Sequence, residues 1–411
     1  MRREACLDRL TVSKVPQIRG LQQVSERCPS HCGTASKCVV RALCSTLRDQ
    51  LPVSVLSKHA LSHGSDCTGY SALSQALTSL QIPNEAQFFS ETNKALQRAL
   101  PEAYSVARMH PDIHAAERRQ EPAVSIYEAG FPCQPFAQQG KQLGAADPRG
   151  SLISDAVVQY IRERQPPCFV LENVPTLATR FTAHFKSITA SCRAAGYTVN
   201  SRILSSESYG LPHHRRRLFI VGVRNPAQVF EWPKALPKSC RPHISDFYDR
   251  KPDGSIDRRA TNETFATSKT FSRNLALAMK HFSQTSINPA ERHYVINLGG
   301  VPQPGHHPHF MENKSPCITA SRGSSRAFFS TYLRRRLSIS ELSRLQGADP
   351  TNALLCSTSS LSERQKGHLL GNAISVPVLM VIVRQMLISA RLASPEAPGY
   401  CAPPRSRLQR D

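Results

Sequence analysis

Short apolar runs alternate with helix-like segments between residues 59 and 224. The apolar runs are residues 88–89, 124–127, 168–171 and 218–223, and the helix-like segments are residues 71–80, 92–100, 151–164 and 181–195. This alternation is typical of repeated strand–helix units, whose strands form a parallel sheet with helices on both faces. We therefore predict an α/β fold with a mostly parallel, doubly wound sheet. Ligands of such sheets bind at the carboxyl ends of the strands, so functional residues should follow the apolar runs.

Side chains suited to chemistry lie next to three of these runs. Cys133 follows the second run, between two prolines, and Glu172 directly follows the third. Arg215 and Arg217 lie just before the fourth. A loop cysteine is a candidate nucleophile and a carboxyl in a pocket is a candidate acid. Each residue alone has an ordinary explanation, because most buried cysteines only pack and most charged residues at strand ends are only solvated.

The charge of the chain favours a polyanionic partner. The sequence has 52 Lys and Arg against 30 Asp and Glu, which gives a formal net charge of 52 − 30 = +22. Nucleic acid is the commonest polyanion that such a protein binds, and a basic surface without a ligand is the alternative. The 13 cysteines are an odd number and are scattered, which fits reduced thiols better than a disulfide framework.

Five segments carry the most specific pattern: PCQPF at 132–136, ENV at 172–174, YGLPHHRRRLFIVG at 209–222, RRLSISELSRLQG at 335–347 and GNAISVPV at 371–378. In this order they resemble the motifs of the DNA cytosine-5 methyltransferases. The segment GSDCTGYSALSQAL at 64–77 is similar to the cofactor loop of that family. The resemblance covers residues 60–224 and 315–385. It implies a Rossmann-like methyltransferase fold and transfer of a methyl group from S-adenosyl-methionine to carbon 5 of cytosine in DNA.

The resemblance also implies roles for the residues next to the strands. Cys133 would add as a thiolate to carbon 6 of cytosine, and Glu172 would be the acid at ring nitrogen 3. Arg215 and Arg217 would brace the reacting nucleotide. Because the target base lies inside a duplex, the enzyme must flip it out of the stack.

A further set of residues matches the cofactor-binding positions of the family: Asp66, Cys67, Thr68, Gly69, Glu91, Asp112, Ile113, Pro132, Leu152, Asn372 and Ala373. Glu91 suits the ribose hydroxyls and Asp112 suits the adenine amino group. The loop at 66–69 has fewer glycines than is usual in the family, which either a divergent loop or a weakened site explains. We expect no metal, because CPSHC at 28–32 resembles only half of a zinc site.

Residues 225–330 carry many Pro, Ser and Asn and show weak periodicity. The family has its target-recognition domain at this place, between two parts of a catalytic domain that we predict at 59–224 and 331–390. We expect a basic, cysteine-containing extension at 1–58 and a tail at 391–411. The residues expected to contact nucleic acid are Gln134, Lys141, His213, Lys269, Arg273, Arg322 and Arg326. Histidine stands at 213, where the family usually has glutamine.

Double-stranded DNA is the expected partner of a monomeric enzyme. Two alternatives stay open: cytosine-5 methylation of transfer RNA, and a catalytically weak nucleic-acid-binding relative with an impaired cofactor loop. No contact with a membrane is expected, since the longest apolar stretch, 374–383, is far shorter than the roughly 20 residues of a membrane-spanning helix. We expect a nuclear location in a eukaryote and a cytoplasmic location otherwise.

Overall fold

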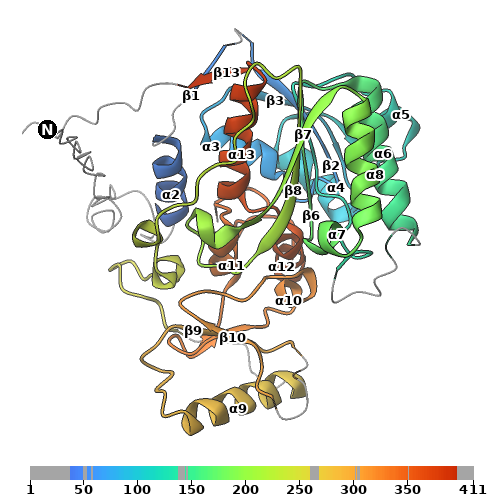
Figure 1. Cartoon of the computed structure of the whole chain (residues 1–411). Helices are drawn as coiled ribbons and strands as arrows, with labels where there is room; N and C mark the ends of the chain where they lie inside the picture. Colours follow the sequence, from blue (N-terminus) through green and yellow to red (C-terminus); the bar gives the residue numbers. More distant parts are fainter. Residues whose placement is uncertain are drawn as a thin grey trace, which may run out of the picture.

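A twisted sheet of seven strands forms the centre of the molecule in the computed structural model (Figure 1). The structure describes residues 38–49, 53–56, 59–137, 144, 147–259, 268–300, 302, 306–349 and 351–395. The strand order is β4-β3-β2-β5-β6-β8-β7. The strands are β2 (Leu61–Asp66), β3 (Asn84–Ser90), β4 (Val106–His110), β5 (Ile126–Ala129), β6 (Cys168–Asn173), β7 (Tyr197–Ser205) and β8 (Arg216–Arg224). All pairs from β4 to β6 are parallel, and β8 is antiparallel to β6 and β7. The predicted mostly parallel α/β sheet is confirmed.

Helices cover both faces of this sheet. Successive residues of a strand point to opposite faces, so Phe89 and Val170 lie in one core, whereas Phe88 and Phe169 lie in the other. The first core contains α2 (Cys38–Asp49), α3 (Ala72–Ser79), α4 (Lys94–Ala103) and α13 (Val376–Ser389). The second contains α6 (Pro148–Arg164) and α8 (Thr182–Ala194). The sheet therefore buries both of its faces, as a doubly wound sheet must.

Strand β2 lies in the middle of the sheet although its sequence, LSHGSD, is polar. Five of its six residues are buried, and the side chains of Ser65 and Asp66 are hydrogen-bonded inside the protein, as in the bond from Ser65 Oγ to Glu128. The ring of Phe88 on β3 fills the space beside Gly64, where a Cβ atom would meet it at 2.2 Å. Glycine at position 64 therefore allows this close packing.

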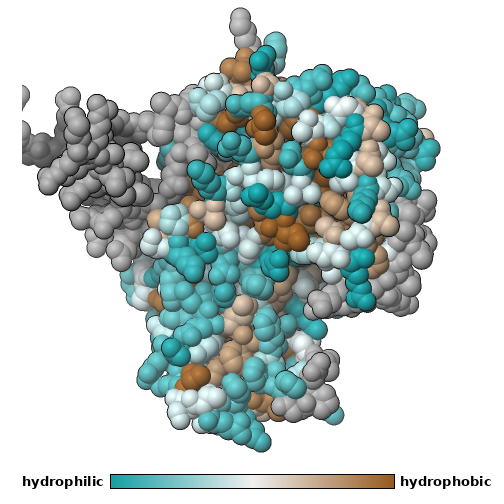
Figure 2. Space-filling model, viewed as in Figure 1, coloured by the Kyte–Doolittle hydropathy of each residue, from teal (hydrophilic) through white to brown (hydrophobic). Residues whose placement is uncertain are grey.

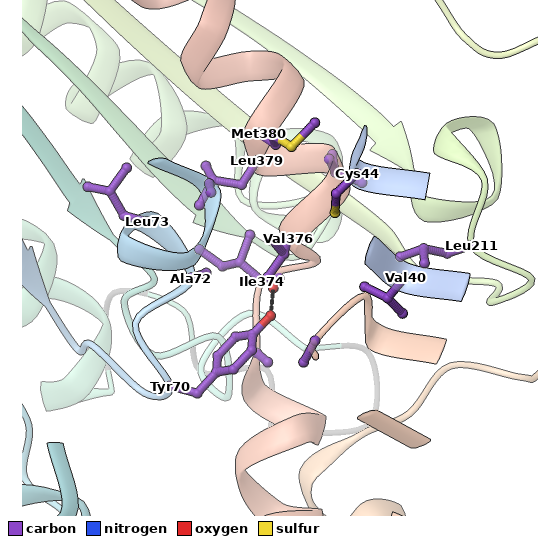
Figure 3. Close-up of a cluster of buried hydrophobic side chains, with 14 of the residues drawn as sticks. Val40, Cys44, Tyr70, Ala72, Leu73, Leu211, Ile374, Val376, Leu379 and Met380 are labelled. Carbon is purple, nitrogen blue, oxygen red and sulfur yellow. Dashed lines mark hydrogen bonds between the residues drawn. The ribbon is translucent and has the colours of Figure 1, made fainter. Parts of the chain in front are cut away.

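Helix α2 lies within the segment 1–58 that the sequence suggested as an extension. Val40 and Leu43 are buried, and the helix contacts α3 and α13. Figure 3 shows Val40 and Cys44 in one apolar cluster with residues of α3 and α13. Leu43 also packs on Gly210, where a Cβ atom would lie 2.6 Å from its Cδ1. Residues 38–49 thus pack as part of the main core, whereas residues 1–37, with the cysteines at 28 and 32, lie outside the described residues.

A smaller unit lies below the main sheet in Figure 1. Its antiparallel sheet has the order β10-β9-β11-β12 and packs on helix α9 through a separate apolar core, which includes Phe282 and Ile296. The elements are α9 (Lys269–Gln284), β9 (Tyr294–Asn297), β10 (Phe310–Glu312), β11 (Phe328–Ser330) and β12 (Arg335–Arg336). Most of the surface of this unit is hydrophilic in the view of Figure 2.

The remaining elements are mostly short and lie between the longer helices and strands or at the ends of the described chain. They are β1 (Val53–Val55), α5 (Ala116–Arg119), α7 (Thr176–Thr179), η3 (Ser206–Tyr209), η4 (Lys238–Cys240), η5 (Ile244–Phe247), α10 (Ala320–Ser324), α11 (Ile339–Gln346), α12 (Glu363–Asn372) and β13 (Ala393–Pro395). Helices α10 and α12 cross at Gly323 and Gly367, where a Cβ atom on either would lie 2.0–2.2 Å from the carbonyl oxygen of the other.

Within the ranges that the structure describes, no single helix is long and apolar enough to span a bilayer, although α12 and α13, bent by 42°, meet the length and composition criteria as a pair.

Candidate active site

A cavity of about 370 Å³ lies at the carboxyl ends of the parallel strands. This volume is within the range of pockets that bind small molecules. Its walls come from the loops after β2, β4 and β5, the ends of β3 and β6, the start of β8 and the region from α12 to α13. The sequence-predicted residues that line it are Cys67, Thr68, Gly69, Glu91, Asp112, Ile113, Pro132, Cys133, Gln134, Glu172, Arg215, Arg217, Asn372 and Ala373.

Cys133 is held in the cavity by a fixed loop. The amide of Asn173 donates a hydrogen bond to the carbonyl of Phe131 over 3.1 Å, so the end of β6 anchors the loop that follows β5. The backbone N–H of Phe136 donates to the carbonyl of Cys133 over 3.0 Å, and Thr176 Oγ1 donates to the carbonyl of Phe136 over 2.5 Å. The thiol therefore has a defined position beside the sheet edge.

Glu172 and Arg217 form the polar wall next to this thiol. Arg217 Nε lies 3.0 Å from Glu172 Oε1 in an ion pair, yet this buried oxygen has no hydrogen-bond partner of good geometry. Burial raises the pKa of the Glu172 carboxyl, and the positive charges of Arg217 and Arg215 lower it by less. The ion pair favours the ionised form of Glu172, whereas burial favours the protonated form. Burial has the larger effect because the side chain is only 7% exposed.

Burial likewise raises the pKa of the Cys133 thiol above its ordinary value of 9.0, and Glu172 acts in the same direction. The positive charges of Arg217 and Arg215 oppose this shift. The cavity thus combines a protonated thiol, a carboxyl that holds its proton more tightly than usual, and a guanidinium.

Arg215 is buried, and its two terminal guanidinium nitrogens donate to three backbone carbonyls. Its guanidinium donates to Ile318 over 3.0 Å, to Gly371 over 3.2 Å and to Ala373 over 2.6 Å. Burial lowers the pKa of Arg215, and the positive charge of Arg217 lowers it further. The three carbonyl acceptors replace hydrogen bonds to water that the buried guanidinium has lost. Arg215 reaches the cavity and also fixes the backbone of α10 and α12 around it, whereas Arg217 presents its charge to Glu172.

The other half of the cavity is rich in carboxyl groups. Glu91 Oε2 accepts from the N–H of Gly69 over 3.0 Å, which links the end of β3 to the loop after β2. Asp112 Oδ1 accepts from the N–H of His114 over 2.8 Å. Cys67 and Gly69 have positive φ values of 53° and 57°. Two residues of the loop 66–69 therefore have left-handed backbone conformations, and only one of them is a glycine.

Asp66 does not line the cavity, contrary to the prediction. Its carboxylate is fully buried and accepts from Arg118 Nε over 2.8 Å, and from the Tyr127 and Ser90 hydroxyls over 2.5 Å each. Arg118 also forms an ion pair with it and lies over the rings of Phe88 and Tyr160. Asp66 is thus a buried structural carboxylate with all of its partners inside the protein.

His213 was also predicted wrongly as a nucleic-acid contact. Its side chain is 0% exposed, and Nε2 accepts from the N–H of Ile318 over 3.0 Å. Burial, with Arg215 and Arg217, lowers the pKa of His213 well below its ordinary value. The neutral ring therefore connects β8 to the segment before α10, because only a deprotonated Nε2 can accept this bond.

The remaining predicted contacts are distributed away from the cavity. Lys269 and Arg273 are exposed on α9 of the smaller unit, whereas Arg322 and Arg326 are half-buried near α10. Lys141 and the side chain of Leu152 lie outside the described residues.

Sequence reasoning assigned no role to Glu128, which is buried on β5 and lines the cavity. It directly follows the apolar run 124–127, so the rule that indicated Glu172 applies to it as well. His368 and Gln365 on α12 also line the cavity, and nothing in the sequence pattern indicated them.

Comparison with known proteins agrees with this geometry. The model of the C-5 cytosine-specific DNA methylase family matches residues 67–387. The Type II methyltransferase M.HaeII of Haemophilus aegyptius is 29% identical over 284 residues, which are 69% of this chain and 80% of the relative. M.NlaX of Neisseria lactamica, another Type II methyltransferase, is 27% identical over 312 residues, 73% of this chain and 87% of the relative.

Solved structures show the same fold. The methyltransferase EhMeth of Entamoeba histolytica superposes with a TM-score of 0.56 at 14% identity, over 80% of this chain and 98% of that chain. The family model spans both units and the cavity between the strand ends and α12. The chain belongs to the C-5 cytosine-specific DNA methylase family, the DNA cytosine-5 methyltransferases.

Proposed function

We propose that the protein transfers a methyl group from S-adenosyl-methionine to carbon 5 of a flipped cytosine in double-stranded DNA, through a covalent adduct with Cys133. One observation carries this proposal: the Cys133 thiol, the Glu172 carboxyl and the Arg217 guanidinium line one cavity with the carboxyl groups of Glu91 and Asp112. This cavity offers separate places for a reacting base and for a cofactor with ribose and amino groups.

Each residue near Cys133 has a defined task in this reaction. The thiol loses its proton to solvent, and the sulfur forms a bond to carbon 6 of the cytosine ring. The electron pair of the double bond between carbons 5 and 6 moves into the bond between carbons 4 and 5 while ring nitrogen 3 takes the proton of Glu172, which the raised pKa of its carboxyl allows. Carbon 5 of the resulting enamine then forms a bond to the methyl group of the donor, whose sulfur keeps the electron pair of the broken bond. Arg217 holds Glu172 in place. A base then removes the proton on carbon 5, the ring double bond re-forms, the sulfur leaves as a thiolate, and nitrogen 3 returns its proton to Glu172. We assign no residue to the removal of the carbon 5 proton.

The carboxyl-rich half of the cavity fits S-adenosyl-methionine. Glu91 can accept from ribose hydroxyls and Asp112 from the adenine amino group, since neither is paired with a cation among the described residues. When bound, this cofactor supplies an electrophilic methyl group. Ile113 and Leu96 add apolar walls for the adenine ring.

The smaller unit would contact DNA. Lys269 and Arg273 are exposed on α9, in the segment where the family has its target-recognition domain. Phosphate contacts of this kind make the affinity for DNA fall as salt rises. Replacing both residues with Ala should weaken binding to all DNA sequences alike and reduce the slope of log affinity against log salt by about 2.

Trapping on duplex DNA that contains 5-fluorocytosine tests the adduct, because the fluorine cannot leave as a proton does. The wild-type protein should form a covalent complex that maps to Cys133, and Cys133→Ser should form none. Cys240→Ser is the matched control, since Cys240 lies on η4 and does not line the cavity. An adduct at another cysteine would refute the assignment. Methyl transfer to transfer RNA but not to DNA would replace the proposed substrate.

A further inference from the structure

Glu128 is a buried carboxyl in the cavity wall for which the proposed chemistry has no role. It lies on β5, five residues before Cys133, and is 2% exposed. Its Oε2 atom accepts a hydrogen bond from Ser65 Oγ over 2.7 Å. No described residue donates a hydrogen bond to its Oε1 atom, and this oxygen, unlike Glu172 Oε1, is not fully enclosed by protein atoms. Because the side chain lines the cavity, Oε1 can meet a ligand there.

The space beside Oε1 is open. The neighbouring wall residue is Gly130, and a Cβ atom there would lie 3.9 Å from Oε1 and 3.6 Å from the side chain of Ile374. Gly130 and Ile374 also line the cavity. A ligand group can therefore approach this oxygen without displacing a side chain.

The charges around Glu128 do not compensate its own. Burial raises the pKa of Glu128 to about 8; the Ser65 hydrogen bond opposes this shift, and Glu172 on β6 and Asp66 on β2 add to it. No described cation forms an ion pair with Glu128, since Arg118 is paired with Asp66 and Arg217 with Glu172. The other titratable groups around the cavity are Cys67, Tyr70, Glu91, Asp112, Cys133, His114, His368 and Arg215. A cation from outside the protein would supply the missing charge.

Glu128 lies at the junction between the two halves of the cavity. Its partner Ser65 immediately precedes Asp66 and the loop 67–69 on the cofactor side, and its own chain continues into the loop of Cys133 on the base side. A methyl donor has to present its reactive group at this junction, because the methyl carbon must reach the base that is bonded to Cys133. In S-adenosyl-methionine that group is a sulfonium, which carries a permanent positive charge.

We propose that Glu128 recognises the sulfonium charge of the methyl donor and makes the site prefer the donor over its neutral thioether product, S-adenosyl-homocysteine. This inference rests on the proposed function. The cation favours the ionised carboxyl, so binding of the donor releases the Glu128 proton to solvent at neutral pH. The product carries no charge on its sulfur and leaves Oε1 without a partner, which favours its release.

Calorimetry on the folded full-length protein tests the proposal with both ligands. We expect wild type to prefer the donor over the product, and Glu128→Gln to lower that preference about tenfold, as a contact of about 1.4 kcal/mol would. Between pH 6.5 and 8.5, the ratio of the affinity for the donor to that for the product should rise more in wild type than in Glu128→Gln. Titration of the ligand amino groups affects both proteins equally, so it cannot explain this difference. Glu117→Gln, an exposed residue of α5, is the matched control.

The outcomes separate the two proposals. If Glu128→Gln lowered the affinity for both ligands by the same factor, the inference would be overturned, because Glu128 would then contact a group that the two ligands share. An unchanged preference would overturn it as well. If the variant does not fold, wild type alone still decides: in buffers of different ionisation enthalpy at pH 7, it should release more protons with the donor than with the product, and equal release would refute the idea. Binding of neither ligand by folded wild type would refute the proposed function itself.

Discussion

Replacing Arg118 with Met should destabilise the protein strongly, because it leaves the Asp66 carboxylate buried without a counter-charge. Asp66 is 0% exposed and Arg118 is 2% exposed. Removing one partner of such a buried pair costs about 3–5 kcal/mol. The guanidinium also lies 4.5 Å from the ring centre of Phe88 and 4.3 Å from that of Tyr160, which adds about 0.5–1 kcal/mol for each contact. We expect a loss of about 4–7 kcal/mol in the free energy of unfolding.

Urea unfolding followed by circular dichroism at pH 7 measures this loss. The double variant Asp66→Asn with Arg118→Met should lose about 2 kcal/mol less than Arg118→Met alone, because no buried charge is left unpaired. Arg41→Met is the control: Arg41 is 52% exposed and lies 2.6 Å from Asp349, so it should lose under about 1 kcal/mol. A loss below 1 kcal/mol for Arg118→Met, or no recovery in the double variant, would refute the reasoning. Asp66→Asn should leave the affinity for S-adenosyl-methionine almost unchanged.

Three further changes test the fold and the cavity. Leu43→Ala should lower the free energy of unfolding by about 2–4 kcal/mol, because Leu43 is 1% exposed in the core, whereas a loosely attached extension would give no change. Gly323→Ala should lower the melting temperature in differential scanning fluorimetry, since its Cβ would lie 2.0 Å from the Gly367 carbonyl and would force α10 and α12 apart; an unchanged melting temperature would contradict the crossing. The pKa of Glu128 is raised from 4.5 to about 8, so its contribution to stability is complete below pH 4.5 and is lost as the pH rises through 8. Between pH 5 and 9, the urea midpoint of wild type should therefore fall relative to that of Glu128→Gln, and parallel profiles would contradict the shift.

The sequence predicted the strands of the sheet that contain uninterrupted runs of apolar residues. Strands β3, β5, β6 and β8 follow from such runs, because a strand buried on both faces needs them. Strand β2 could not be predicted from periodicity, since His63, Ser65 and Asp66 are polar, and Ser65 and Asp66 have partners that lie more than 50 residues along the chain. The edge strand β7 alternates only weakly between buried and exposed residues.

The residues of the candidate site, like the strands, could be predicted only in part. The motif residues Cys133, Glu172 and Arg217 line one cavity, and their catalytic roles stay predictions. Asp66 and His213 were misplaced because burial depends on contacts that no local pattern encodes: Arg118 is 52 residues from Asp66, and Ile318 is 105 residues from His213. Helix α2 was missed because its place in the core depends on tertiary contacts, including those with α13, which is more than 300 residues away.

The three carbonyl bonds of Arg215 have a consequence for how the site is built during synthesis. They connect the start of β8 to Ile318, Gly371 and Ala373, which the ribosome adds more than 100 residues later. A nascent chain that ends after β8 already contains the thiol, the acid and both arginines, but it lacks the wall from α12 to α13 that completes the cavity. Until that last segment arrives, the guanidinium of Arg215 has none of its carbonyl acceptors, so a competent enzyme should emerge only near the end of translation.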